Sequence, residues 1–154
     1  MTGFVLRTDG GARGNPGPAG CAFVLQSADG ETLVRGGRFL GETTNNVAEY
    51  EALLWGLRVA LERGSKPLTV YSDSELMVRQ LNGAYRVKNQ GLKPLYDEAC
   101  RLIALLGDVR VVHVRRSDNK EADALANAAM DCRGVVGDAP PSCGEGSEQG
   151  TLFG

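Results

Sequence analysis

The chain has 154 residues, 42% of them hydrophobic and 23% charged, and its formal net charge is −2. This composition fits one globular domain with a real core, and no apolar run approaches the roughly 20 residues that span a bilayer, which excludes a membrane-spanning helix. The acidic balance argues against a general nucleic-acid binder, unless several negative charges gather around bound cations.

The first 40 residues predict an antiparallel meander of three strands. An apolar, β-rich segment ends at Asp9-Gly10-Gly11, and Gly14-Asn15-Pro16-Gly17-Pro18 has the composition of a turn. Asp29-Gly30 is a hairpin signal, so the connections are short and the strands are neighbours. The expected strands are residues 4–8, 21–25 and 31–40.

The hydrophobic period then changes to that of a helix running to about Arg63. Apolar residues recur at spacings of three and four, which places them on one buried face. Asn45 or Asn46 is expected to cap this helix, and Trp55 is expected in the core. The apolar face consists of Val47, Tyr50, Leu54, Leu57 and Leu61.

The remaining segments alternate between strand and helix. From Arg133 onward Gly, Pro, Ser and acidic residues dominate, so residues 133–154 are predicted to form a disordered tail or linker after a domain of residues 1–132. The expected strands are residues 68–72 and 109–114, and the expected helices are residues 74–81, 94–106 and 120–132.

The order βββαβααβα indicates an α/β fold with a five-stranded mixed sheet flanked by helices. Helical crossovers make strands one, four and five parallel neighbours, and ligand sites in such sheets lie at the carboxyl ends of the strands. Asp9 closes the first strand and Asp73 closes the fourth. We therefore expect their carboxylates side by side at one end of the sheet.

Taken singly, each of four acidic residues has a structural explanation. Asp9 fits a turn before two glycines and Asp73 fits a helix N-cap. Glu49 and Asp123 are expected in first helical turns, where the helix dipole favours an acid. Together, four converging carboxylates would repel one another strongly without cations. Such a cluster makes sense if it holds hard divalent ions through oxygen ligands, and two such ions suit phosphoryl transfer.

Four segments resemble the type 1 ribonuclease H family, in family order and at family spacing, over about residues 3–132. The resemblance implies the ribonuclease H-like fold with spatial strand order 3-2-1-4-5. It also implies hydrolysis of the RNA strand of RNA–DNA hybrids, leaving a 3′-hydroxyl and a 5′-phosphate. The segments are Thr8-Asp9-Gly10-Gly11 with Gly14-Asn15-Pro16-Gly17, Thr43-Thr44-Asn45-Asn46-Val47-Ala48-Glu49-Tyr50, Ser72-Asp73-Ser74, and Asn119-Lys120-Glu121-Ala122-Asp123-Ala124-Leu125-Ala126.

The resemblance assigns the metal ligands and catalytic residues. Asp9 would bridge two Mg²⁺ ions, Glu49 and Asp73 would complete one metal site, and Asp123 would complete the other. Mn²⁺ also suits an oxygen-only site.

Substrate contacts are implied in the same way. Asn15 and Asn45, with backbone groups of residues 11–13, would face the RNA minor groove and read 2′-hydroxyls, which distinguish RNA from DNA. Thr44 and Asn89 would help to seat a phosphate of the DNA strand. The structural alternatives are a turn residue for Asn15 and a helix cap for Asn45. The implied contacts are Gly11, Ala12, Arg13, Asn15, Thr44, Asn45 and Asn89.

The sequence departs from the family pattern in two places. Many members carry a catalytic histidine between the fifth strand and the last helix, but residues 115–119 hold none. The single histidine, His113, is expected to be a structural residue of the strand. This indicates a shorter-loop branch, with Arg116 or Asp118 near the site. Residues 85–93 also replace the long basic protrusion of some relatives with three cations.

Other functional hypotheses stay open at this point. A catalytically silent hybrid-binding module is one, although the presence of all four acids argues against it. Another is the nuclease half of a larger protein, with a C-terminal domain fused through the predicted tail. An integrase or resolvase nuclease would share the acids but lack the Gly14-Asn15-Pro16-Gly17 loop and the Thr44-Asn45-Asn46 run.

The cellular setting is expected to be the cytoplasm. Residues 1–5 lack the basic and long apolar regions of a signal peptide. No Cys-x-x-Cys pair is present, so neither a zinc site nor a disulfide framework is expected, and a monomer is the default. The cysteines are Cys21, Cys100, Cys132 and Cys143.

Overall fold

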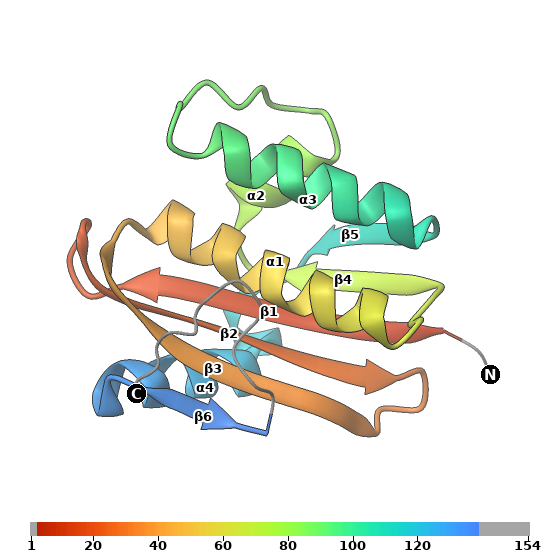
Figure 1. Ribbon diagram of the computed structural model, residues 1–154, viewed down its shortest axis with the longest axis horizontal. Helices are drawn as coiled ribbons and strands as arrows, with labels where there is room; N and C mark the ends of the chain where they lie inside the picture. Colours follow the sequence, from red (N-terminus) through yellow and green to blue (C-terminus); the bar gives the residue numbers. More distant parts are fainter. Residues whose placement is uncertain (1–2, 139–154) are drawn as a thin grey trace.

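The computed structural model describes residues 3–138 and shows a six-stranded mixed sheet with helices on both faces (Figure 1). The sheet order is β5-β4-β1-β2-β3-β6, with β1 antiparallel to β2 and parallel to β4. This confirms the α/β class and the order 3-2-1-4-5 for the first five strands. The strands are β1 (Phe4–Ala12), β2 (Gly17–Ser27), β3 (Thr32–Thr43), β4 (Leu68–Ser72), β5 (Val109–His113) and β6 (Val135–Gly137). The helices are α1 (Asn45–Glu62), α2 (Glu75–Leu81), α3 (Lys93–Leu106), the 3₁₀ turn η1 (Arg116–Asp118) and α4 (Lys120–Cys132).

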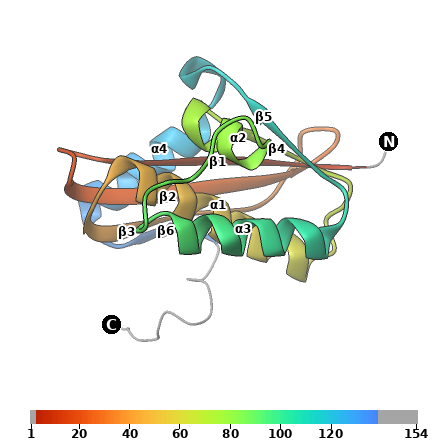
Figure 2. The same cartoon turned by 90° about the horizontal axis from the view of Figure 1, so that it is seen from above.

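The helices form two layers around the sheet. α1 and α3 cover one face, and α4 covers the other (Figure 2). Trp55 of α1 is fully buried and meets the Phe23 ring of β2 edge to face, with ring centroids 4.9 Å apart, which confirms its place in the core. Within residues 3–138, no helix combines the length and apolar character needed to cross a membrane. The predicted apolar stripe of α4 is buried: Ala122, Leu125, Ala126 and Ala129.

Helix α1 is buried over more of its circumference than the sequence pattern predicted, because it lies between the sheet and α3. Its N-cap is Thr44, whose hydroxyl accepts the Val47 backbone N–H at 3.2 Å. The prediction of Asn45 or Asn46 as the cap is therefore wrong, since both residues lie inside the first turn.

The register between β1 and β4 decides where the acidic side chains lie. Thr8 pairs with Ser72 in the parallel ladder, so Asp9 and Asp73 are the next residues on the two strands. β4 ends there, whereas β1 continues to Ala12 paired with β2. The predicted juxtaposition of the first and fourth strands is confirmed.

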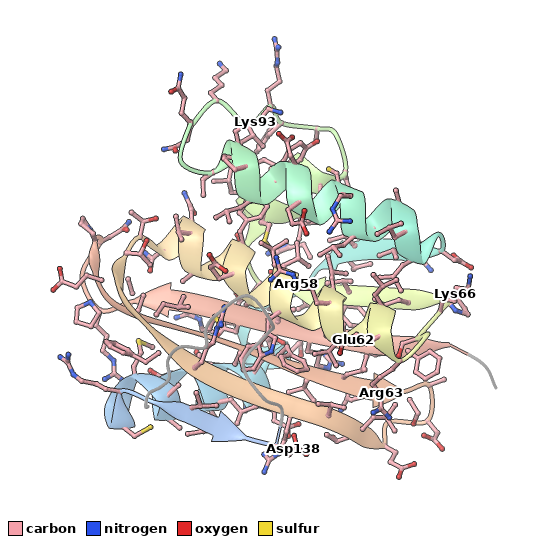
Figure 3. All side chains as sticks on the ribbon, in the orientation of Figure 1. Arg58, Glu62, Arg63, Lys66, Lys93 and Asp138 are labelled. Carbon is pink, nitrogen blue, oxygen red and sulfur yellow. The ribbon has the colours of Figure 1, made fainter. Side chains whose placement is uncertain are left out.

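A sixth strand, which follows α4 in the chain, extends the sheet at the β3 edge. Val135–Gly137 pairs antiparallel with β3, and Asp138 directly follows it (Figure 3). The Asp138 carboxylate accepts the Arg35 backbone N–H at 2.8 Å. The expectation of five strands, with a tail directly after α4, is therefore wrong for residues 133–138. A strand of three residues is too short for hydrophobic periodicity to reveal. Residues 139–154 of the predicted tail lie outside the described residues.

Gly10 of β1 fits directly against the backbone of α1. A Cβ at Gly10 would lie 2.2 Å from the Ala48 carbonyl oxygen and 2.7 Å from the Glu49 nitrogen. We predict that Gly10→Ala lowers the free energy of unfolding by roughly 1–3 kcal/mol, because main chain rather than a side-chain end must move. Equilibrium urea denaturation measures the change.

Gly11→Ala is the matched control on the same strand. Its Cβ would meet the Asn45 Oδ1 at 3.7 Å, which is an ordinary van der Waals contact. We expect a change within about 0.5 kcal/mol. Equal losses in the two variants would contradict the close packing of α1 on β1.

Candidate active site

Three carboxylates from three elements meet at the carboxyl ends of β1 and β4. Asp9 belongs to β1, Asp73 follows β4, and Glu49 lies on α1; one carboxylate oxygen of each lies within 4.8 Å of those of the other two. Asp9 is 4% exposed and the Asp73 side chain 7%. The structure thus brings three of the four predicted acids into one largely buried cluster, called the acidic triad below.

The helix dipole does not explain Glu49. α1 begins at Asn45, so Glu49 lies in the second turn, and the expectation that it lies in the first turn is wrong. The close approach of Gly10 to the backbone of Ala48 and Glu49 brings this turn against β1. A glycine in the strand is therefore what places a helical carboxylate beside Asp9.

Asp73 is not a helix cap either. The N-cap of α2 is Ser74, whose hydroxyl accepts the Met77 backbone N–H at 3.3 Å. The Ser74 backbone N–H donates to the Ser72 hydroxyl at 3.0 Å. The hydroxyls of two serines thus accept the backbone N–H groups at the start of α2, so the N-cap explanation of Asp73 is wrong.

Asp123 approaches the triad from α4, on the other face of the sheet. It lies in the first turn of α4, as predicted. Asp9 and Asp123 both line a cavity of about 280 Å³. Asp123 lies outside the 4.8 Å triad but close enough to raise the pKa of Asp9. The cavity is also lined by Gly10, Gly11, Ala12, Arg13, Asn45, Arg116, Ala126, Asn127 and Met130.

Burial and nearby negative charge raise the pKa of two of the carboxyl groups, Asp9 and Glu49. Burial, followed by the charge of Asp73, raises the pKa of Asp9 from 3.8 to about 8. Burial, followed by the charges of Asp9 and Asp73, raises the pKa of Glu49 well above its usual value.

Two oxygen atoms of the triad make no hydrogen bond. Among the described residues, Glu49 Oε1 and Asp73 Oδ2 are buried without a hydrogen-bond partner. A buried polar atom without a partner is costly, and a cluster of carboxylate oxygens is the donor set that hard divalent cations prefer. The residues present therefore fit a metal ion. Its positive charge would take the place of the protons that the carboxyl groups bind in its absence.

Arg116 is the cation beside the triad. It lies on η1, its Nε is 3.8 Å from Asp73 Oδ2, and its side chain is 79% exposed. This ion pair is longer than a hydrogen bond and leaves the guanidinium largely in solvent.

His113 is the last residue of β5, within the strand as expected.

Two asparagines join the β1–β2 loop to the start of α1. Asn45 Oδ1 accepts the Ala12 backbone N–H at 2.7 Å, and Asn15 Oδ1 accepts the Asn45 backbone N–H at 3.1 Å. Each side chain bridges two segments rather than capping its own helix or closing its own turn. Predicted substrate-contact residues thus form one framework at the rim of the cavity.

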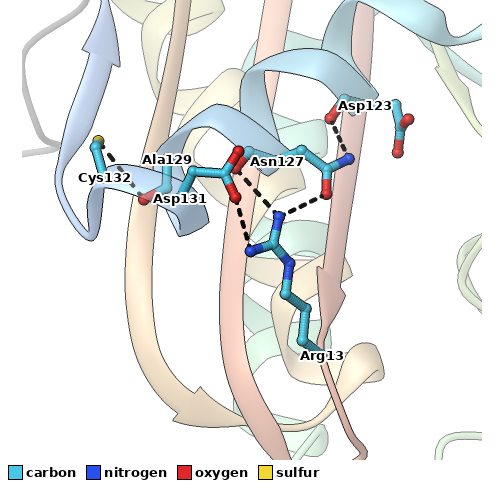
Figure 4. Close-up of polar contacts among 6 residues, drawn as sticks. All are labelled: Arg13, Asp123, Asn127, Ala129, Asp131 and Cys132. Carbon is cyan, nitrogen blue, oxygen red and sulfur yellow. Dashed lines mark hydrogen bonds and ion pairs between the residues drawn. The ribbon is translucent and has the colours of Figure 1, made fainter.

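Arg13 extends this framework to α4 (Figure 4). Its Nη1 lies 2.8 Å from Asp131 Oδ1, and its Nη2 donates to Asn127 Oδ1 at 3.1 Å. Asn127 Nδ2 in turn donates to the Asp123 carbonyl oxygen at 3.0 Å. Sequence reasoning missed Asn127, although its position four residues after Asp123 places it on the same helix face.

The side chains of Thr44 and Asn89 each accept backbone N–H groups at or just before the start of a helix. Thr44 caps α1, and Asn89 Oδ1 accepts the backbone N–H groups of Gly91 and Leu92 at 2.7 Å and 3.2 Å, just before α3. Within residues 3–138, Asn89 does not line the cavity beside the carboxylates. The predicted phosphate contact of Thr44 and Asn89 stays a prediction.

Comparisons with known proteins agree with this geometry. A family model described as "Reverse transcriptase-like" matches residues 7–129. The crystal structure of RNase H1 from Halobacterium salinarum has a TM-score of 0.81 and 40% identity, covering 84% of this chain and 98% of that one. The chain belongs to the type 1 ribonuclease H family. A second ribonuclease H structure, LC11-RNase H1 in complex with an RNA/DNA hybrid, has a TM-score of 0.81 and 41% identity, covering 84% and 97% of the two chains.

This ribonuclease H domain also matches part of a longer protein. A protein of Mycobacterium tuberculosis named as bifunctional is 41% identical over 141 residues, which cover 90% of this chain and 39% of that protein. The chain therefore spans well under half the length of this relative.

The raised pKa of Asp9 predicts how the metal-free domain responds to pH. The native Asp9 carboxyl binds its proton more tightly than the unfolded one, so the contribution of this group to stability is fully present below about pH 4 and is lost as pH rises through about 8. We predict that Asp9→Asn removes this loss and becomes more stable than the wild type by on the order of 3 kcal/mol at pH 9.

Urea denaturation in a chelator at pH 5 and pH 9 measures this difference. Glu121→Gln is the control, because Glu121 is an exposed acid on α4 that pairs with Arg35 at 3.6 Å. A gap between Asp9→Asn and the wild type that stays constant with pH would contradict the assigned repulsion.

Proposed function

We propose that this ribonuclease H domain is an active endoribonuclease, which hydrolyses the RNA strand of RNA–DNA hybrids and leaves a 3′-hydroxyl and a 5′-phosphate. The observation that carries the proposal is the acidic triad, with buried oxygens that make no hydrogen bond, beside a cavity that Asp123 also lines. A module that only bound hybrids would gain nothing from like charges that destabilise its metal-free fold. The silent-module hypothesis is therefore disfavoured.

We infer that the acids hold two Mg²⁺ ions, with Asp9 contributing to both, Glu49 and Asp73 to one, and Asp123 to the other. Mn²⁺ has the same preference for oxygen ligands and is the alternative ion. When bound, such ions supply the positive charge that phosphodiester hydrolysis requires. The contribution of the chain is to hold the four acids in place.

The framework at the cavity rim supports hybrid recognition. We propose that Asn15, Asn45 and the backbone of residues 11–13 read 2′-hydroxyls in the minor groove. The LC11 protein was solved with an RNA/DNA hybrid, which supports the same substrate class here. We also propose that Thr44 and Asn89 seat a phosphate of the DNA strand.

Arg116 takes part in place of a loop histidine in this proposal. Its exposed guanidinium lies beside Asp73, where it can contact a phosphate of the cleaved strand. We also propose that the chain belongs to the shorter-loop branch, which the short connector between β5 and α4 supports.

The wider setting is also a proposal. The long mycobacterial relative, named as bifunctional, supports a role as the nuclease part of a larger protein. Free cysteines suit a reducing cytoplasm; those in the described part are Cys21, Cys100 and Cys132.

We predict that Asp9→Asn slows hybrid cleavage by roughly 100-fold or more while the fold is retained, because the shared carboxylate of the metal site is lost. Chelation of the metal is expected to have the same effect. Cleavage of labelled hybrid, double-stranded RNA and double-stranded DNA of one sequence measures both. Glu121→Gln, an exposed acid two residues from Asp123, is expected to stay within about twofold of the wild type.

Wild-type rates in Asp9→Asn would overturn the assignment of the acids. Equal cleavage of all three duplexes would overturn the hybrid specificity. Tight hybrid binding without cleavage, in either Mg²⁺ or Mn²⁺, would favour the silent binding module instead.

A further inference from the structure

A buried asparagine outside the acidic cluster joins α4 to β1. Asn119, between η1 and α4, is 1% exposed, and its Nδ2 donates to the Thr8 carbonyl oxygen at 2.8 Å. Because a carbonyl oxygen can only accept, the side-chain atom that faces Thr8 must be the amide nitrogen. This contact joins residues 111 positions apart in the chain.

The contact lies at the point where β1 stops pairing with β4. Thr8 is the last residue of β1 that pairs with β4, and Asp9 follows it. The Asn119 carboxamide therefore attaches α4 to the strand at the residue directly before Asp9.

Asn119 is bonded to the other side of the cavity as well. Its carbonyl oxygen accepts the Asp123 backbone N–H at 3.2 Å, so it belongs to the helical turn that carries Asp123. Its own backbone N–H donates to the Arg116 carbonyl oxygen at 2.9 Å. One residue thus connects the backbone beside Asp9, the turn of Asp123 and the turn of Arg116.

The chemistry of the side chain indicates more than filling of the core. Among the described residues, Asn119 Oδ1 is buried without a hydrogen-bond partner. An aliphatic side chain of similar size would avoid the cost of this unpaired acceptor. The half-satisfied carboxamide is explained if the bond to Thr8 is needed for the geometry of the site.

We propose that Asn119 is a positioning residue, which fixes the separation of the Asp9 and Asp123 carboxylates and thereby the affinity of the cluster for divalent cations. It acts through the backbone on both sides and contacts neither the reacting phosphate nor the metal. The proposal rests on the metal-dependent nuclease function proposed above.

The test compares Asn119→Ala with Asn82→Ala. Asn82 makes the same kind of bond, from its Nδ2 to the Val111 carbonyl oxygen of β5 at 3.1 Å, and it does not line the cavity among the described residues. Two quantities are measured: Mn²⁺ affinity by calorimetry without substrate, and kcat and KM for a labelled hybrid. Asn119→Asp is the second variant, because it keeps the size of the side chain and removes the N–H donor.

We expect each Asn119 variant to bind Mn²⁺ roughly 10-fold more weakly or worse, with a comparable fall in kcat and KM within about twofold. Asn82→Ala is expected to lose stability without either change. If the Asn119 variants bind Mn²⁺ and turn over like Asn82→Ala, the proposal is wrong. A wild type that fails to cleave hybrids would overturn the proposed nuclease function, while the Mn²⁺ affinities would still decide the role of Asn119.

Discussion

The repulsion among buried carboxylates is the constraint on which the rest of this structure depends. Asp9, Glu49 and Asp73 have oxygens within 4.8 Å of one another and are largely shielded from water. Burial and the charge of Asp73 make Asp9 and Glu49 harder to ionise, so the cluster destabilises the fold until cations bind. The two-layered core, with Trp55 packed on Phe23, offsets this cost.

Backbone contacts, rather than contacts among the acids, hold the cluster together. The β1–β4 register aligns Asp9 with Asp73, and the close approach of Gly10 to α1 brings in Glu49. Asn119 attaches α4 next to Asp9. Because each contact joins main chain to main chain, or a buried amide to main chain, the site has little freedom to spread apart when its protons are lost.

Sequence reasoning succeeded where topology alone decides the outcome. Parallel neighbouring strands end at the same edge of a sheet, so the proximity of Asp9 and Asp73 could be predicted from the sequence. It failed where neighbouring polar residues compete for one local role, since Thr44 caps α1 and neither Asn45 nor Asn46 does. Strand β6 and the buried hydrogen bond from Asn119 to Thr8 depend on contacts between distant segments, which no local pattern reveals.

Anomalous diffraction from crystals grown with Mn²⁺ would show directly whether the buried carboxylates bind a divalent cation. We expect Mn²⁺ bound by oxygens of Asp9, Glu49 and Asp73, with little movement of the backbone around the site. The Asp9→Asn crystal, grown in the same way, should lose that density. Mn²⁺ bound elsewhere, or a triad that stays empty in a correctly folded wild type at saturating Mn²⁺, would contradict it.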